Sequence, residues 1–188
     1  QRLSRGLGDV YKRQLFLFST PILKIINAKL NNFDFMEIID THTHLYLDQF
    51  DHDFDDAIQR SFANNISKFV FPSISSMHYS KMVNCKKKYP KNIFLMLGLH
   101  PVYVDKNYNQ ELKFVKNQIS QNNFVAIGEI GLDKYWSTEF YKQQIEAFEM
   151  QIDLALKKNL PIIIHCRDAY KDVILSLIHI SEPTRQSL

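Results

Sequence analysis

Two histidines separated by one residue, His42 and His44, follow a short apolar segment at residues 37–41. If this segment is a strand, its side chains alternate between two faces, so both histidines point the same way. Two imidazoles about 6–7 Å apart on a strand can converge on one metal ion. Two surface or hydrogen-bonding histidines are the alternative. Asp40 falls on the opposite face, and we expect it to form a hydrogen bond rather than bind metal.

Glu129 lies between Gly128 and Gly131, directly after the apolar residues 124–128. Glycine frees the backbone to turn there, and this lets a carboxylate approach a metal closely. A carboxylate can also bridge two ions, which a histidine nitrogen rarely does. The alternative is a glutamate that caps the next helix.

His165 follows a third apolar segment at residues 160–164, so it is either a metal ligand or a core histidine with a hydrogen-bond partner. Its neighbour Cys166 is a soft metal ligand or a free buried cysteine. Arg167 is suited to hold an anion such as phosphate, or it pairs with Asp168.

A further histidine, His100, stands before Pro101 and is a candidate for contacting substrate or hydrogen-bonding a leaving group. A loop histidine packed on Pro101 is the alternative. Asp133, Tyr135 and Trp136 are candidates for the mouth of a site, where aromatic rings stack on a base or sugar. Packing in the core or at the rim is equally compatible with them.

Apolar strand-like segments alternate with amphipathic helical segments along the chain, which predicts an α/β fold with a parallel sheet buried on both faces. The expected strands are residues 37–41, 68–72, 92–98, 124–128 and 160–164, and the expected helices are residues 53–64, 79–89, 109–122, 138–158 and a segment from 168 onward. This pattern favours a TIM-type (β/α) barrel of which about the first five β/α units are present. No Gly-x-Gly-x-x-Gly turn supports a dinucleotide fold.

Polar candidates cluster after the ends of these strands, which is the catalytic face of a β/α barrel. His42, His44, Glu129 and His165 follow the first, fourth and fifth strands. This set suits a hydrolytic site with divalent metal, in which ions activate water and stabilise charge on the substrate. His52 and His78 lie away from the strand ends and are expected to be solvated.

Both ends of the chain can be encoded by one oligonucleotide read on opposite strands. Read antiparallel, residues 4–14 and 175–185 pair through complementary codons, as Gln14 (CAG) does with Leu175 (CTG). The segments resemble a transposon-end adapter used in sequencing-library preparation. We therefore expect residues 1–14 and 175–188 to be artefacts.

Charge and composition change once these ends are set aside. The chain has 188 residues and a formal charge of +3. Residues 1–14 carry +3 and residues 175–188 carry zero, so the rest is neutral and gives no electrostatic argument for nucleic acid. Residues 15–35 are interpreted as upstream translation or an N-terminal extension, and their apolar part is too short for the ~20 residues of a membrane span. Two cysteines fit a reducing, cytoplasmic setting.

Four segments together resemble the successive signatures of the TatD family of metal-dependent hydrolases. They are residues 39–45 (Ile-Asp-Thr-His-Thr-His-Leu), 98–101 (Gly-Leu-His-Pro), 128–133 (Gly-Glu-Ile-Gly-Leu-Asp) and 161–169 (Pro-Ile-Ile-Ile-His-Cys-Arg-Asp-Ala). The resemblance covers residues 36–174. It implies a β/α barrel and DNase activity on phosphodiester bonds, with two divalent ions (Mg²⁺, Mn²⁺ or Zn²⁺) and with DNA or another phosphodiester as partner. Neither a membrane nor an obligate protein partner is expected.

By this resemblance, His42 and His44 bind one ion, Glu129 bridges as a catalytic carboxylate, and His165 binds the second ion. The family also uses a later histidine and a late aspartate, and neither segment is present here, so we expect this chain to be inactive and poorly folded. A PHP-type phosphoesterase or small-molecule amidohydrolase is the alternative enzyme, although residues 128–133 argue against both. A non-catalytic metal-binding fragment is the alternative outside enzymes.

Overall fold

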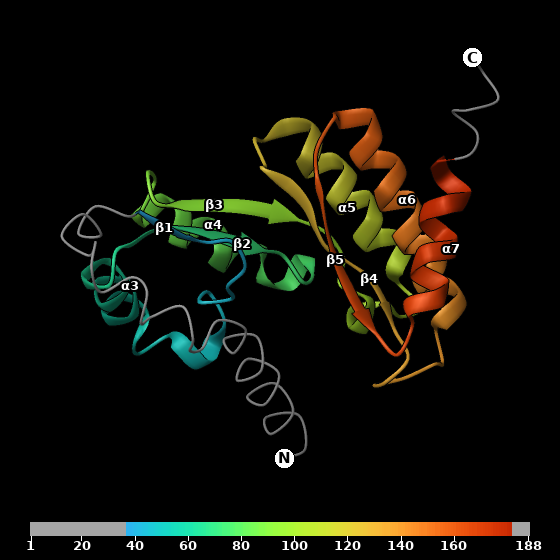
Figure 1. Ribbon diagram of the computed structural model, residues 1–188, viewed down its shortest axis with the longest axis horizontal. Coiled ribbons are helices and arrows are strands. Elements are labelled where there is room, and N and C mark those ends of the chain that lie inside the picture. Colours follow the sequence, from blue (N-terminus) through green and yellow to red (C-terminus); the bar gives the residue numbers. More distant parts are fainter. Residues whose placement is uncertain (1–36, 182–188) are drawn as a thin grey trace, which may run out of the picture. The chain divides into compact units, whose positions relative to one another are not determined.

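Five parallel strands form one sheet in the order β1-β2-β3-β4-β5, so each strand pairs with the next one along the chain. The computed structural model describes residues 37–181. The strands are β1 (Ile38–Asp40), β2 (Ile66–Pro72), β3 (Ile93–Leu97), β4 (Ala126–Asp133) and β5 (Ile162–Arg167). This sequential parallel order is half of a β/α barrel and confirms the predicted fold class (Figure 1).

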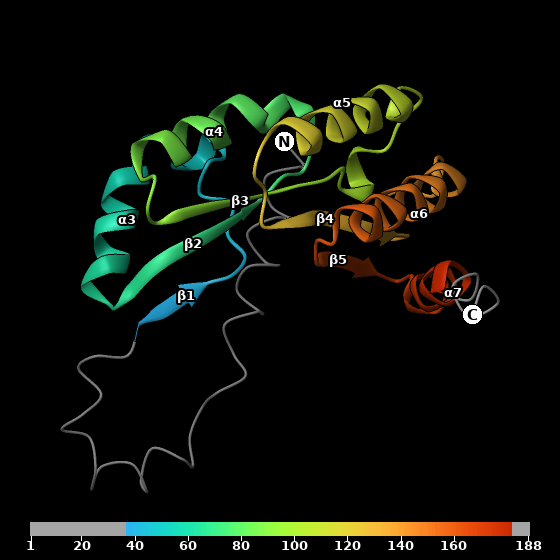
Figure 2. The same cartoon turned by 90° about the horizontal axis from the view of Figure 1, so that it is seen from above.

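A helix connects each strand to the next, and a last helix follows β5. The helices are α3 (Phe54–Ala63), α4 (Tyr79–Lys88), α5 (Tyr108–Gln121), α6 (Tyr141–Lys158) and α7 (Tyr170–Ser181). Short 3₁₀ turns at Asp48–Phe50, Ser76–His78 and Pro101–Tyr103 complete the order. Figure 2 shows α3 to α6 following one another along the same side of the strands. Right-handed crossovers through helices are the usual way to connect parallel strands.

The core lies between this helical layer and the central strands. Ile58 of α3, the inward residues of α5 (Leu112, Val115 and Ile119), and Phe148 of α6 are buried, as their helical spacing predicts. Leu156 was expected on the buried face of α6 but is 60% exposed. Two glutamines, Gln144 and Gln151, are buried on that helix.

The edge strands β1 and β5 differ from the central ones. Strands β3 and β4 are almost wholly buried, whereas Ile39 of β1 is 48% exposed and Ile164 of β5 is also exposed. The prediction of burial on both faces therefore holds for the centre of the sheet and is wrong at its edges. The reason is that β1 and β5 each have one neighbouring strand within residues 37–181.

Two strands end later than predicted, and this changes where the candidate ligands sit. Strand β4 runs to Asp133 rather than residue 128, and β5 runs to Arg167 rather than residue 164. Their ladder continues from Ile130 opposite Ile164 to Asp133 opposite Arg167. Glu129 and His165 therefore lie within strands, not after them.

The predicted segments at residues 1–14 and 15–35 lie outside the described residues, as do residues 182–188. Helix α7 continues through residues 175–181, the described part of the segment predicted to be an adapter. The origin of both ends stays a prediction. Within residues 37–181, no helix combines the length and apolar character needed to cross a bilayer.

Candidate metal centre

Glu129 occupies the middle of a group of four histidines. One carboxylate oxygen, Oε2, lies 3.1 Å from Nε2 of His42 and 3.5 Å from Nε2 of His44. The other, Oε1, lies 3.2 Å from Nδ1 of His165 and 3.9 Å from Nε2 of His100. The two oxygens thus face different histidines, as a bridging carboxylate requires.

Three strands bring His42, His44, Glu129 and His165 together from distant parts of the sequence. His42 and His44 follow β1, and their Nε2 atoms are 3.3 Å apart. Glu129 comes from β4, where the ladder with β5 is irregular between Ile127 and Ile130, and its amide donates to the carbonyl of Ser73 instead. His165 comes from β5.

His44 is 6% exposed, and a tyrosine fixes its ring. The Tyr46 hydroxyl donates its hydrogen to the carbonyl of Pro72 at 2.6 Å, so its oxygen accepts from Nδ1–H of His44 at 2.9 Å. In the neutral imidazole this leaves the lone pair on Nε2, the atom that faces Glu129. A ring oriented through its second nitrogen is the arrangement typical of metal-binding histidines.

His165 is oriented by a carboxylate instead. Its Nε2 lies 2.8 Å from Oδ2 of Asp133, and a carboxylate only accepts, so Nε2 carries the hydrogen. Burial lowers the pKa of His165, but the hydrogen bonds to Asp133 and Glu129 outweigh it and raise the pKa to about 9. A metal ion that binds Nδ1 must displace a proton below that pH.

Glu129 is held as a carboxylate by its neighbours. Burial disfavours the charged form, but hydrogen bonds from His165 and His42 outweigh burial and hold the pKa of Glu129 well below its usual value. The buried Asp133 behaves similarly: burial raises its pKa, and hydrogen bonds from His165 and from the amide of Trp136 bring the pKa below its usual value. Both carboxylates are therefore charged at neutral pH.

His100 enters the same site with a different hydrogen-bonding role. Its Nδ1 accepts from the amide of Val102 at 3.2 Å, and burial lowers the pKa of His100 to about 3, so the ring is neutral with its hydrogen on Nε2. That Nε2–H lies 3.1 Å from Nδ1 of His165. His100 is thus a donor directed into the site rather than a third nitrogen ligand.

The donor set fits divalent metal. In the described part of the chain, two groups have their potential ligand atoms within 4.8 Å of one another, namely His42, His44 and Glu129, and His100, Glu129 and His165. Both contain Glu129. Imidazole and carboxylate ligands suit Zn²⁺ or Mn²⁺, and Mg²⁺ prefers oxygen. The set therefore fits a divalent centre that shares one carboxylate.

Several other candidates take simpler roles. Asp40 accepts a hydrogen bond from the amide of His42 at 3.1 Å, as expected. Cys166 is free and exposed and belongs to neither ligand group. His52 is exposed as predicted, but the prediction for His78 is wrong. His78 is half-buried because its ring packs between Tyr46 and Tyr103, which in the sequence are far from it.

Sequence reasoning missed the residues that support this centre. Tyr46 orients His44, and its alternation with His42 and His44 was the available signal. Gln151, 1% exposed, accepts from the amide of Leu99 at 2.7 Å and so fixes the segment that carries His100. Gln144 accepts from the amide of Asp133 at 2.9 Å. A glutamine within an apolar helical stripe was the signal for both.

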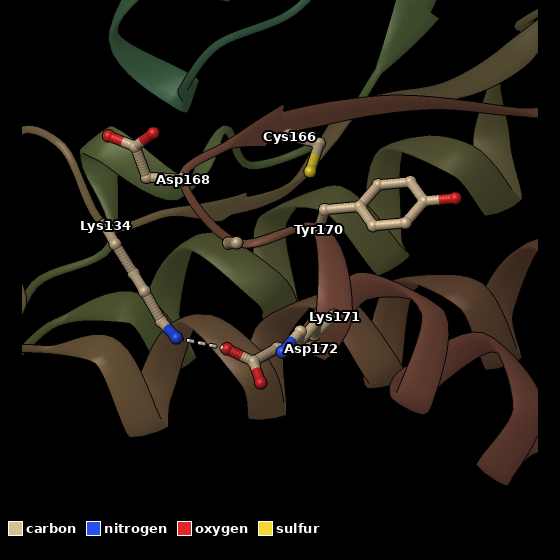
Figure 3. A pocket seen from close by; sticks show the side chains of 7 residues that line it. Lys134, Cys166, Asp168, Tyr170, Lys171 and Asp172 are labelled. Atoms are coloured by element: carbon tan, nitrogen blue, oxygen red, sulfur yellow. Dashed lines mark ion pairs between the residues drawn. The ribbon is translucent and has the colours of Figure 1, made fainter.

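A separate hollow of about 690 Å³ lies beyond β5. It is lined by Lys134, Cys166 and residues 168–172, none of which is in the ligand groups (Figure 3). Lys134 and Asp172 form an ion pair of 2.5 Å across it. Because Cys166 alternates with His165 along β5, the hollow is on the other side of the strand from the metal centre.

The family model described as TatD related DNase matches residues 39–185, so the chain belongs to this family. It is 35% identical over 140 residues to the metal-dependent hydrolase YabD of Bacillus subtilis, covering 74% of this chain and 54% of that protein. It is 28% identical over 151 residues to deoxyribonuclease TATDN3 of Homo sapiens, covering 73% and 54%.

Solved structures agree with the fold. The crystal structure of YjjV, a TatD homolog from Escherichia coli K12, matches with a TM-score of 0.71 and 26% identity over 78% of this chain and 57% of that chain. A TatD family hydrolase from Entamoeba histolytica matches in fold with a TM-score of 0.62 at 22% identity, covering 78% and 55%. The chain thus spans about half the length of the relatives it matches.

Proposed function

We propose that this chain is the first five β/α units, residues 36–174, of a metal-dependent phosphodiesterase that acts on DNA. The observation that carries the proposal is the shared carboxylate of Glu129, whose two oxygens face His42 and His44 on one side and His165 on the other. Membership of the TatD family and the similarity to a human deoxyribonuclease support DNA as the substrate.

In this proposal His42 and His44 would hold one divalent ion, His165 would hold a second, and Glu129 would be shared between them. Such ions, when bound, polarise a phosphoryl oxygen and lower the pKa of water. Mg²⁺, Mn²⁺ and Zn²⁺ are all candidates. Tyr46 and Asp133 keep His44 and His165 in the tautomers that present a lone pair to the centre.

His100 completes the proposed chemistry as a hydrogen-bond donor. When Nδ1 of His165 is engaged as a ligand, Nε2–H of His100 is available to an oxygen of the phosphate or the leaving group. Its low pKa, about 3, keeps the ring neutral, so it donates a hydrogen bond without delivering a proton as a cation.

The later histidine and aspartate of the family pattern lie outside this sequence, so we propose that the chain binds divalent metal but does not turn over DNA. The free cysteines Cys85 and Cys166 suit a reducing, cytoplasmic setting, which is part of the proposal.

The test uses the complete product of the gene beside the 188-residue chain. We expect the complete protein to cleave a labelled single-stranded oligonucleotide with Mg²⁺, Mn²⁺ or Zn²⁺, to lose cleavage in EDTA, and to lose it on Glu129→Gln. Hydrolysis of amides or lactones without DNA cleavage would favour the amidohydrolase alternative. Metal-stimulated cleavage by residues 36–174 alone would contradict the expected inactivity of the chain.

A further inference from the structure

Arg167 lies beside the metal centre on β5. His165 and Arg167 are separated by one residue, so their side chains lie on the same face of the strand, about 6–7 Å apart along it. Across the ladder, Gly131 is opposite His165 and Asp133 is opposite Arg167. Arg167 is therefore the next residue along this face towards the carboxyl end of the sheet, where β/α barrels bind substrate.

The charge of Arg167 has no acidic partner among residues 37–181. The sequence left pairing with Asp168 open, but no carboxylate in the described range lies within ion-pair distance of this guanidinium. It stacks instead on Tyr135, with Cζ 3.5 Å from the ring centroid, and lies 5.5 Å from the ring of Trp136. A guanidinium on an aromatic face keeps its N–H edges available to an anion.

The two aromatic side chains are large and exposed. Tyr135 is 55% exposed and Trp136 is 42% exposed, and their rings meet edge to face with centroids 5.1 Å apart. Exposed aromatic rings beside a cationic groove are the usual platform for single-stranded nucleic acid, because every base has a face that can stack.

Asp133 connects these aromatic residues to the metal centre. Its Oδ1 accepts hydrogen bonds from the amides of Tyr135 at 2.8 Å and Trp136 at 3.0 Å, while its Oδ2 accepts from His165 at 2.8 Å. One buried carboxylate therefore sets the position of the aromatic segment relative to a proposed ligand. A substrate held by this segment is held in a fixed relation to the centre.

We propose that Arg167, Tyr135 and Trp136, the Arg167 platform, form a nucleotide subsite in which a base stacks on Trp136 and Arg167 binds the adjoining phosphate of single-stranded DNA. The inference rests on the proposed function, since it places this nucleotide beside the phosphodiester to be cleaved. Tyr135 is a positioning residue that holds the guanidinium in place.

The single tryptophan of the sequence makes the platform directly observable. The 188-residue chain is titrated in EDTA with octathymidylate and with an abasic octamer of the same charge, while Trp136 fluorescence and the anisotropy of a fluorescein label on the DNA are recorded. We expect octathymidylate to quench Trp136 and to bind about tenfold more tightly than the abasic octamer.

Two variants separate the stacking from the charge. Trp136→Leu should weaken octathymidylate about tenfold and leave the abasic octamer unchanged, whereas Arg167→Gln should weaken both. Arg60→Gln, which removes a charge from α3 on the helical layer, is the matched control for Arg167 and should change neither. Tyr170→Leu is the aromatic control and should change neither affinity. The ring of Tyr170 is exposed and points away from Lys134 in Figure 3.

The possible results distinguish failure of the nucleotide subsite from failure of the proposed nuclease function. Quenching and a base-dependent affinity in EDTA support the platform even if the complete protein cleaves no DNA. Equal affinity for the two octamers, no binding of octathymidylate, or bound DNA that leaves Trp136 fluorescence unchanged overturns the platform while the metal-dependent hydrolysis stands. Circular dichroism of each variant excludes unfolding as the cause.

Discussion

The two halves of the candidate metal centre meet at Glu129 but orient their histidines differently. On one side, His44 is bonded to the neutral hydroxyl of Tyr46, which is anchored on the carbonyl of Pro72. On the other side, His165 is bonded to the charged carboxylate of Asp133. A hydroxyl fixes a tautomer without adding charge, whereas a carboxylate also raises the basicity of the ring.

This difference predicts different sensitivities. The His165 half should depend on pH and on the electrostatic partner, and the His44 half should depend on packing, because Tyr46 is 2% exposed and lies against Phe71. Glu129 belongs to both halves of the centre, so loss of this carboxylate should weaken metal binding in both halves alike.

The largest effect is expected from Glu129→Gln, which keeps the shape of the side chain and removes its charge. Since loss of a ligand's hydrogen-bond partner alone costs about 10–100-fold in metal affinity, loss of the shared ligand should cost more than about 100-fold. Calorimetric titration with Mn²⁺ or Zn²⁺ measures this. Glu139→Gln, in an exposed loop, is the control, and retained binding in Glu129→Gln would disprove a shared carboxylate.

Gly131→Ala should disrupt the His165 half of the centre, because the added Cβ would displace the backbone of β5. Gly131 has a φ of +147°, and a Cβ there would lie 1.9 Å from the carbonyl oxygen of His165, its partner in the ladder. We expect a loss of roughly 3 kcal/mol or more in the free energy of unfolding, measured in urea. Gly98→Ala, whose Cβ first meets the side chain of Ile130, should cost less. Equal losses of unfolding free energy in the two variants would contradict a tighter backbone contact at Gly131 than at Gly98.

The pH dependence of the metal-free chain reports on the His165 half. Because the pKa of His165 is raised to about 9 in the folded state from an ordinary value of 6.5, its stabilisation is complete below about pH 6.5 and is lost as pH rises through 9. The stabilisation lost over this pH range is on the order of 3 kcal/mol in the free energy of unfolding.

Unfolding in urea with EDTA from pH 6 to 10 measures this loss. Asp133→Asn removes the charge that raises the pKa, so it should flatten the dependence and lower metal affinity about 10–100-fold. The lowered pKa of Glu129 acts in the opposite range, since its stabilisation is present above about pH 4.5 and is lost as pH falls. An unchanged profile in Asp133→Asn would assign the alkaline loss to another group.

The smallest effect is expected from Tyr46→Phe. It removes the partner of His44 and leaves the carbonyl of Pro72 without this donor, which should cost about 1–2 kcal/mol of stability and about tenfold in metal affinity. The alkaline pH profile should not change, because no charge is removed. Tyr79→Phe, which loses a hydroxyl bonded to Gln118 outside the centre, is the control for stability.

Much of the fold follows from local patterns in the sequence. All five strands and all five helices occur close to the predicted residues, because apolar runs and helical periodicity are local properties. The strand ends were less predictable. Pairing between β4 and β5 extends both strands through Glu129 and His165, and this pairing depends on residues about 35 positions apart.

The sequence by itself determined the family, the order of the β/α units and the residues His42, His44, His100, Glu129 and His165 as candidates, since these depend on residue type and spacing. Only the tertiary structure decided what holds them. Tyr46, Asp133 and Gln151 act through hydrogen bonds to Pro72, His165 and Leu99.

Arg167 shows the same division. Its type predicted an anion site or a pair with Asp168, and the structure placed it on Tyr135 instead. The physical reason is that a hydrogen bond or a stacked ring requires atoms within a few ångströms of one another. Such proximity between β4 and β5 arises only when the parallel sheet forms.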